Sequence, residues 1–213
     1  MWTSKNYGYK IDRLLTSNLP LLVRGQGRAV LIDSCRQKAW HTFKKKLDRI
    51  LCDQALDYLI LTHEHDDHIE TVKDLVETYG CQVIMHRETL SSLRDLDAFD
   101  YRLVDDQLSL DELGLNGQVL WTPGHSHGSI SIIIDQVIFL GDLLGEFITK
   151  GFAKKVKRVN DDVLESVNRL LSYKGQYYFT SHKKTVLSHD DLGLLVYRYG
   201  IGDRIDNLED LKD

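Results

Sequence analysis

The sequence predicts a mixed α/β fold with a layered core. Short apolar runs rich in β-branched residues, such as 29–32 and 130–134, indicate buried strands. Segments with apolar residues at helical spacing, such as 37–51 and 160–175, indicate helices between them. Clusters of histidine and aspartate follow directly after several apolar runs, and α/β sheets carry their functional sites at such strand ends.

Length and composition fit one globular domain. A chain of 213 residues can bury one sizeable core, so we predict a single domain over residues 1–213 that ends in an acidic tail at about 203–213. The net charge of −5 argues against nucleic acid as a partner. No apolar run approaches the ~18 residues that a membrane span requires, so we expect no membrane partner.

The cysteines and the N-terminus favour a cytoplasmic protein. The chain has 3 cysteines, Cys35, Cys52 and Cys81, which are too few for a disulfide framework and odd in number. Residues 1–6 lack the apolar segment of a secretory signal peptide. We therefore expect a cytoplasmic location. The sequence leaves the oligomeric state open.

The first part of the chain predicts strands followed by a helix. Strands are expected at 7–15, 19–23 and 29–32. Gly25-Gln26-Gly27 is typical of a hairpin turn between the last two. A helix is expected over about 37–51, and Asp33 precedes it at a place where an aspartate can cap a helix.

The most informative segment is Thr62-His63-Glu64-His65-Asp66-Asp67-His68, which follows the apolar run 58–61. Side chains alternate along an extended segment, so His63 and His65 point the same way and can bind one metal ion. Asp67 and His68, where the chain turns into a helix, can reach a second ion. A solvated polar loop is the alternative, but three imidazoles seldom gather in such a loop.

A helix is expected directly after this segment. Its apolar face is formed by Ile69, Val72, Leu75, Val76 and Tyr79. Gly80 would end the helix. A strand at 81–85 follows, and we interpret His86 at its end as a structural residue. Residues 95–116 show no readable periodicity.

The second half of the chain repeats the pattern of strands that end in polar residues. Strands are expected at 117–121, 130–134, 137–140 and 176–180. His125, Asp142 and His182 each follow one of them, and helices are expected after Asn160 and at 192–199. A carboxylate has two oxygens, so Asp142 can bridge two ions ~3.5–4 Å apart, but an aspartate there can also cap a helix or a turn.

The motif His63-x-His65-x-Asp67-His68 resembles the signature of the metallo-β-lactamase superfamily, whose members are hydrolases with one or two metal ions. Thr122-Pro123-Gly124-His125, Gly141-Asp142 and Ser181-His182 match the later motifs in order, with Ser181 in place of the usual glycine. The resemblance extends from Ser17 to His182 and implies an αβ/βα four-layer sandwich. Within this family the bridging aspartate implies the glyoxalase II, lactonase and phosphodiesterase branches, and we favour the glyoxalase II-like and lactonase-like branch.

The resemblance also assigns roles to the polar residues. It places His63, His65 and His125 on a first metal ion and Asp67, His68 and His182 on a second, with Asp142 bridging both. It makes Asp33 a support behind the ligands. Asp33 therefore has two alternative roles, a support of the metal site or a helix cap. His127 is additional to the pattern: it either contacts the substrate or is an exposed loop side chain.

These residues predict two divalent metal ions per chain and a metal-dependent hydrolase. Imidazole and carboxylate without thiolate favour Zn²⁺, with Fe or Mn as alternatives. In this hypothesis a metal-bound hydroxide attacks a thioester, lactone or similar ester, and Asp67 is the candidate proton donor. A small phosphodiester hydrolase and a non-catalytic metal-binding scaffold are the alternatives.

The expected partner is a small-molecule substrate. The basic stretch at 150–158 would favour an anionic substrate if it flanks the site entrance, and it is otherwise a solvated loop. The physiological substrate and the native metal are left open by the sequence.

Overall fold

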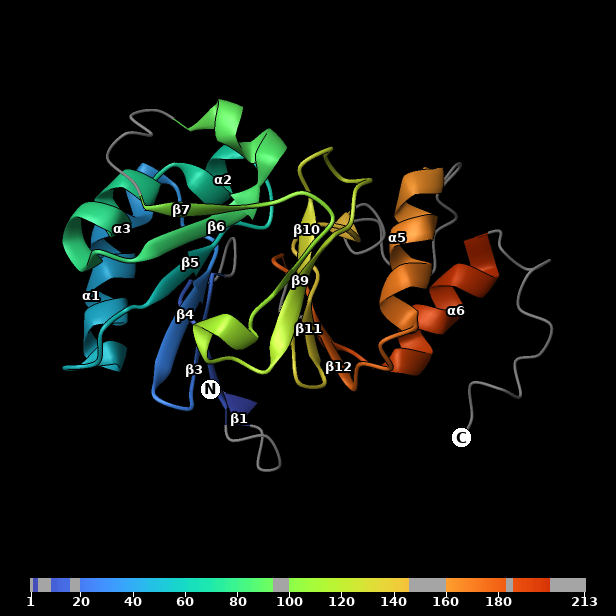
Figure 1. The fold of residues 1–213 in the computed structure, drawn as a ribbon, viewed down its shortest axis with the longest axis horizontal. Helices are drawn as coiled ribbons and strands as arrows, with labels where there is room; N and C mark the ends of the chain where they lie inside the picture. The colour runs from blue at the N-terminus through green and yellow to red at the C-terminus, as the bar shows by residue number, and fades with distance from the viewer. Residues whose placement is uncertain are drawn as a thin grey trace.

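The computed structural model describes residues 2–3, 9–15, 20–93, 100–145, 160–182 and 186–199. The predicted basic stretch at 150–158 and the predicted acidic tail at 203–213 lie outside these ranges. Two β-sheets pack face to face, and helices cover the outer face of each sheet (Figure 1). This arrangement confirms the predicted αβ/βα four-layer sandwich.

The first sheet has seven strands in the order of the chain. They are β1 (Trp2–Thr3), β2 (Lys10–Arg13), β3 (Leu21–Gly25), β4 (Arg28–Ile32), β5 (Tyr58–Ile60), β6 (Gln82–His86) and β7 (Tyr101–Val104). Strands β1 to β4 pair antiparallel, and β4 to β7 pair parallel. The predicted hairpin turn joins β3 and β4, and Gln26 and Gly27 both have the positive φ that a two-residue hairpin turn requires.

The second sheet has six strands in the order β13-β12-β11-β10-β9-β8. They are β8 (Gln107–Ser109), β9 (Gly117–Trp121), β10 (Ile130–Ile134), β11 (Val137–Phe139), β12 (Tyr177–Phe179) and β13 (Val186–Leu187). Only β11 and β12 pair parallel; the other neighbours in this sheet are antiparallel. The predicted strands at 130–134 and 137–140 are β10 and β11, which pair antiparallel across the turn at Asp135-Gln136.

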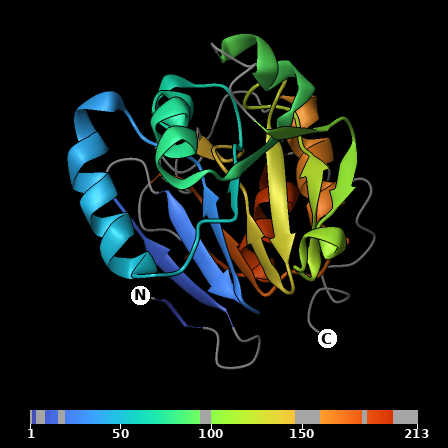
Figure 2. The ribbon, with the colours of Figure 1, turned by 60° about the vertical axis from the view of Figure 1, so that its left-hand side comes forward.

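The helices form the two outer layers (Figure 2). They are α1 (Trp40–Leu51), α2 (Asp66–Ile69), α3 (Val72–Tyr79), α5 (Asp161–Leu171) and α6 (His189–Tyr199), with short 3₁₀ turns η1 (Gln37–Ala39), η2 (Arg87–Ser92) and η4 (Asp111–Leu113). Helices α1 and α3 pack on the first sheet, and α5 packs on the second. Within the described ranges, no helix combines the length and apolarity needed to cross a bilayer.

Apolar side chains fill three clusters, one between the sheets and one under each helical layer. In β4, Val30 and Ile32 face the opposite sheet, while Ala29 and Leu31 face α1. Both faces of the central strands are therefore buried, which explains why these strands read as continuous apolar runs in the sequence.

The helix predicted after the His63–His68 segment is two helices. Helix α2 ends at Ile69, and α3 begins at Val72. Thr71 lies between them. Its hydroxyl donates to the Cys35 carbonyl at 3.0 Å and accepts from the Cys35 amide at 3.2 Å. The predicted end of the helix at Gly80 is confirmed, but the prediction that Ile69 lies in the same helix was wrong, because the bond of Thr71 to Cys35, 36 positions away, separates α2 from α3.

The two sheets are joined at the edge where the polar clusters lie. The Ile130 amide donates to the Thr62 carbonyl at 2.8 Å, which links the loop after β5 to the start of β10. Gly141 lies directly against Thr62, because a Cβ atom at Gly141 would come within 2.8 Å of the Thr62 side chain. The φ of Gly141 is +56°, which also favours glycine. The strand ends of both sheets therefore meet closely at one edge.

Candidate metal centre

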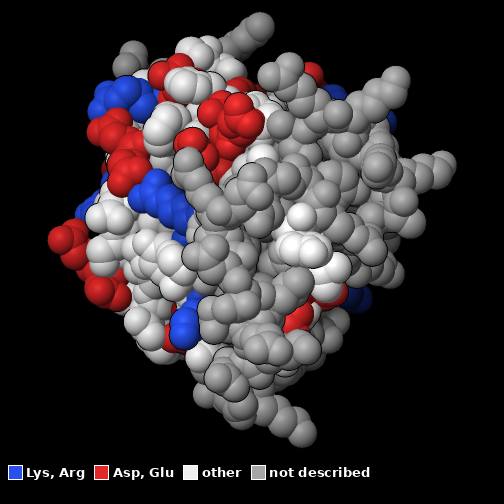
Figure 3. All heavy atoms as spheres, turned by 90° about the vertical axis from the view of Figure 1, so that its right-hand side faces the viewer, with Lys and Arg blue, Asp and Glu red and all other residues white. Residues whose placement is uncertain are grey.

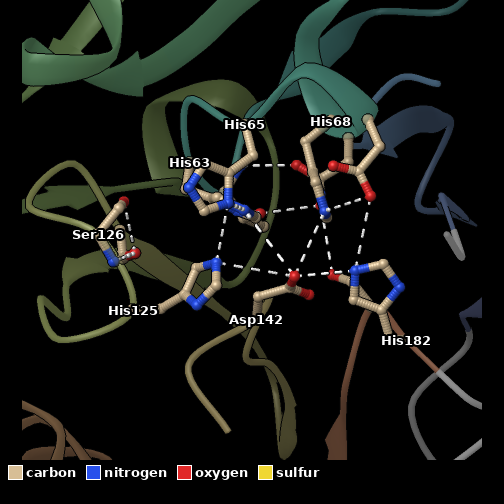
Figure 4. A network of polar contacts seen from close by, with 12 residues as sticks. His63, His65, His68, His125, Ser126, Asp142 and His182 are labelled. Atoms are coloured by element: carbon tan, nitrogen blue, oxygen red, sulfur yellow. Dashed lines mark hydrogen bonds and ion pairs between the residues drawn. The ribbon is translucent and has the colours of Figure 1, made fainter. Parts of the chain in front are cut away.

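The structure brings all the predicted ligand side chains together at this edge (Figure 4). They come from five places: the loop after β5 (His63, His65), helix α2 (Asp67, His68), the β9–β10 loop (His125), the turn after β11 (Asp142) and the end of β12 (His182). Both sheets contribute, so the centre forms only when the two halves of the sandwich pack together.

The first group contains the three imidazoles of His63, His65 and His125. His65 Nδ1 lies 3.1 Å from His63 Nε2 and 3.0 Å from His125 Nε2. Zinc–nitrogen bonds of about 2.0–2.1 Å in a tetrahedral site place neighbouring ligand nitrogens ~3.3 Å apart. The three nitrogens are therefore spaced for one ion, and we call this group the first triad.

The second group contains Asp67, His68 and His182, and we call it the second triad. Asp67 Oδ2 lies 3.7 Å from His68 Nε2 and 3.6 Å from His182 Nε2. His68 is buried, whereas the side chains of Asp67 and His182 are 23% and 30% exposed. The second triad is therefore buried on one side and accessible to a small molecule on the other.

Asp142 lies between the triads. Its Oδ2 atom is 2.9 Å from His182 Nε2 and 3.7 Å from His68 Nε2. The same oxygen is 3.8 Å from His125 Nε2 and 4.0 Å from His63 Nε2. One carboxylate oxygen thus faces ligand atoms of both triads, which is the position of a bridging ligand.

Two buried polar atoms of this centre lack a hydrogen-bond partner among the described residues, and a divalent cation would satisfy them. His68 Nε2 and Asp142 Oδ1 are buried, yet neither has a hydrogen-bond partner in the described part of the chain. Leaving a buried polar atom unpaired costs roughly 1–3 kcal/mol. A cation bound by these atoms would remove that cost, and a set of imidazoles and carboxylates suits Zn²⁺, Fe or Mn.

Asp33 supports ligands of both triads. Its Oδ2 accepts from His68 Nδ1 at 2.9 Å and from the Thr62 hydroxyl at 2.9 Å, and its Oδ1 accepts from the Thr62 amide at 2.7 Å. The Thr62 hydroxyl in turn lies 3.0 Å from His63 Nδ1. Each Nδ1 therefore donates its proton away from the centre, which leaves the Nε2 lone pairs of His63 and His68 directed into it.

The alternative interpretation of Asp33 as a helix cap is not supported. The residue that precedes η1 is Arg36, and it makes no side-chain capping bond. The Asp33 carboxylate instead accepts hydrogen bonds from Thr62 and His68, and from the Ser181 hydroxyl at 3.5 Å. Asp33 has a left-handed φ of +63°, which directs its carboxylate toward the loop after β5.

Burial and charge separate the two buried histidines. Burial, helped by the neighbouring imidazoles, lowers the pKa of His63 to about 2. Burial also opposes a charge on His68, but the Asp33 and Asp142 carboxylates outweigh it and raise the pKa of His68 to about 10. The pKa of Asp142 is lowered by His182 and His68 against the effect of burial. The Asp33 and Asp142 carboxylates therefore favour a positive charge on His68, whereas burial keeps His63 neutral.

His127 does not join the centre. Its side chain is exposed, and its ring lies edge-on to Trp121 with centroids 5.7 Å apart. The Trp121 indole donates to the His127 carbonyl at 2.8 Å. His86, interpreted as structural, stacks on the Trp121 ring and uses both ring nitrogens in bonds to the backbone of residues 88 and 105.

Two residues of the site were not predicted from the sequence. Glu64 stands between two candidate ligands, and Ser126 follows His125; the Ser126 hydroxyl donates to Glu64 Oε2 at 2.9 Å. The two residues are 62 positions apart, so no local pattern indicates their contact. The only available signal was the polar type of both residues beside the ligands.

Comparison with known proteins gives a family match over most of the chain. The profile of the Metallo-beta-lactamase superfamily matches residues 17–182. A hydroxyacylglutathione hydrolase of Shewanella pealeana is 28% identical over 123 residues, which is 58% of this chain and 43% of that protein. The probable polyketide biosynthesis zinc-dependent hydrolase PksB of Bacillus subtilis is 26% identical over 146 residues, which is 66% of this chain and 55% of that protein.

Solved structures share the fold at low sequence identity. The chemotaxis sensor ODP, solved with a peroxy diiron species, has a TM-score of 0.71 at 14% identity, and the match covers 92% of each chain. At this identity the likeness supports the four-layer fold alone. The chain spans about half the length of the curated relatives described above, 43% of one and 55% of the other.

Proposed function

This chain belongs to the metallo-β-lactamase superfamily, and on that premise we propose that it is a dinuclear metal-dependent hydrolase of thioesters, lactones or similar esters. The observation that carries the proposal is the position of Asp142, whose Oδ2 lies within 4.0 Å of ligand atoms from both triads. A site for one ion would not need a carboxylate between two complete triads.

The proposed ions are held by the residues already described. The first triad would hold one ion, the second triad another, and Asp142 would contact both. When bound, two divalent ions lower the pKa of a shared water to about 7 and polarise a substrate carbonyl. Hydrolysis at neutral pH follows from that chemistry.

The chain itself supplies orientation and access. Asp33 and Thr62 hold the rings of His68 and His63 rigidly, so the ligand atoms do not need to reorganise during a reaction. His65 is exposed, and the side chains of His125 and His182 are 23% and 30% exposed. A substrate would therefore approach from the side of these three residues.

We propose that Asp67 would accept the proton that the attacking water gives up and would pass it to the leaving group. Its carboxylate lies at the accessible side of the second triad, with the side chain 23% exposed. Asp67→Asn is expected to lower kcat by ~10²–10⁴-fold, because general acid catalysis contributes about that much. Steady-state kinetics on protein shown by mass spectrometry to carry both ions provides the measurement. Full activity of that doubly loaded variant would remove this role from Asp67.

The ester and thioester class is supported by the relatives. One is named as a hydroxyacylglutathione hydrolase and another as a zinc-dependent hydrolase of polyketide biosynthesis. Because the chain spans only part of each, recognition of their whole substrates does not transfer with the site. The proposal is therefore limited to the bond that is cleaved.

A small, anionic substrate is proposed as the partner. Arg36 places its guanidinium 3.9 Å from Asp67 Oδ1, and its side chain is 45% exposed beside the second triad. On the face shown in Figure 3, acidic and basic side chains of the described residues lie side by side. Among the described residues on that face, basic side chains have acidic neighbours, and this mixed charge favours a small molecule over a nucleic acid.

A substrate panel tests the proposed function. Chromogenic thioesters, lactones and bis-phenyl phosphate are assayed with the protein reconstituted in Zn²⁺ or Mn²⁺, with His182→Ala as the matched control. Turnover of a thioester or lactone that is lost in the control is expected. Turnover of the phosphodiester alone would replace the proposed bond type, and a flat panel with both ions bound would favour a metal-binding scaffold.

A further inference from the structure

Glu64 lies between two ligands of the first triad but points away from the ion they would share. Side chains alternate along an extended segment, so His63 and His65 face the centre while Glu64 faces the β9–β10 loop. There its Oε2 accepts a hydrogen bond from the Ser126 hydroxyl at 2.9 Å. Ser126 is the neighbour of His125, which lies beside it on the same loop (Figure 4).

The surroundings of this bond hold its two partners in place. Ser129 Oγ lies 2.9 Å from Ser126 Oγ and accepts from the Ser126 amide at 3.0 Å. Gly128 packs directly on Glu64: a Cβ atom at Gly128 would come within 2.6 Å of Glu64 Oε2 and 2.9 Å of Thr89 Oγ1. The backbone of the β9–β10 loop therefore packs against the Glu64 carboxylate, and the Ser126 hydroxyl points toward that carboxylate.

The Glu64–Ser126 bond crosses between the two halves of the first triad. His65 and His125 are 60 positions apart, yet their ring nitrogens must lie about one ligand spacing apart to share an ion. At the base of the two loops the Ile130 amide bonds to the Thr62 carbonyl. The Glu64–Ser126 bond joins the loops at a second point, next to both ligands.

We propose that the Glu64–Ser126 pair positions His125 against His65 and thereby sets the affinity of the first triad for its ion. This inference rests on the metal binding in the proposed function. A hydrogen bond to a charged acceptor is stronger than one between neutral groups, so its loss frees the β9–β10 loop to move. Supporting partners of metal ligands typically change metal affinity by about 10–100-fold.

The test measures each triad separately. The His182→Ala variant keeps only the first triad complete. The His125→Ala variant keeps only the second triad complete. Ser126→Ala is added to each, and Zn²⁺ dissociation constants are measured by competition with a chromogenic chelator. We expect affinity to fall by about tenfold in the first background and by less than ~2-fold in the second. Equal losses in both backgrounds, or none in the first, would overturn the proposal.

A double-mutant cycle and a spectrum separate positioning from general damage to the fold. Glu64→Ala and Ser126→Ala together should cost no more affinity than either alone, because each removes the same bond, whereas additive losses would contradict the pairing. Glu64→Gln keeps an oxygen acceptor and should retain most of the affinity. The visible absorption of Co²⁺ in the first triad should change with Ser126→Ala, and an unchanged spectrum counts against the proposal.

The outcome for the wild type distinguishes this inference from the proposed function. A wild-type chain that binds no Zn²⁺ in the same assay would contradict the proposed function itself. A wild-type chain that binds two ions, with Ser126→Ala unaffected, would contradict only the positioning role of Glu64 and Ser126.

Discussion

The two triads lie side by side but differ in charge and in support. The first triad has three imidazoles and no carboxylate of its own, whereas the second has two imidazoles and the Asp67 carboxylate. Asp33 bonds directly to His68, a ligand of the second triad. It reaches His63, a ligand of the first triad, only through the Thr62 hydroxyl. The first triad would therefore leave a bound ion more of its charge to polarise a substrate, whereas the Asp67 carboxylate would neutralise more of the charge of an ion in the second.

Removal of a ligand from one triad is expected to have the largest effect on this comparison. His125→Ala should leave one ion at the second triad, and His182→Ala should leave one at the first. The lost affinity should exceed the ~10–100-fold that supporting residues contribute, because a ligand bond itself is removed. Metal content after dialysis, measured by plasma mass spectrometry, checks this, and loss of both ions in both variants would show that the triads do not bind independently.

Changes behind the ligands should have intermediate effects that differ between the triads. Thr62→Val removes the hydroxyl that lies beside His63 Nδ1 and donates to Asp33 Oδ2, so affinity should fall by about tenfold at the first triad and by less at the second. Asp33→Asn removes the charged partner of His68, so it should lower the Zn²⁺ affinity of both triads. Zinc titrations in the single-triad backgrounds measure this. A Thr62→Val variant that weakens both triads equally would contradict the separate supports.

The smallest effect is expected from Arg36. Its guanidinium lies 3.9 Å from Asp67 Oδ1 with the side chain 45% exposed, and exposed ion pairs contribute roughly 0–1 kcal/mol. Arg36→Ala should therefore change Zn²⁺ affinity of the second triad by less than ~5-fold and leave the first unchanged. The same titrations show this, with Arg36→Lys as the control for charge. A larger loss would assign Arg36 a direct part in holding Asp67.

Much of the centre was readable in the sequence because its ligands follow strands. His63, His125, Asp142 and His182 each lie within a few residues of the end of a short apolar run, and strand ends of packed sheets meet at one edge. The apolar runs themselves were clear because the central strands are buried on both faces. The grouping of the ligands into two triads came from the family resemblance, and the structure brings the same residues together.

Other features depend on contacts that no local pattern shows. The role of Asp33 was left open because a helix cap and a support for His68 look alike in sequence, and only the packing of the loop after β5 separates them. The break between α2 and α3 depends on the bond of Thr71 to Cys35. Strands β7 and β8 were not predicted, because they are short and only partly buried.

Metal content per chain in the wild type and in Asp142→Ala tests the central claim most directly. Plasma mass spectrometry on protein reconstituted with Zn²⁺ and dialysed should find two equivalents in the wild type. It should find one or none in Asp142→Ala, because Asp142 Oδ2 faces ligand atoms of both triads. No stoichiometric metal in the wild type, or two equivalents retained without Asp142, would contradict the bridged two-ion centre.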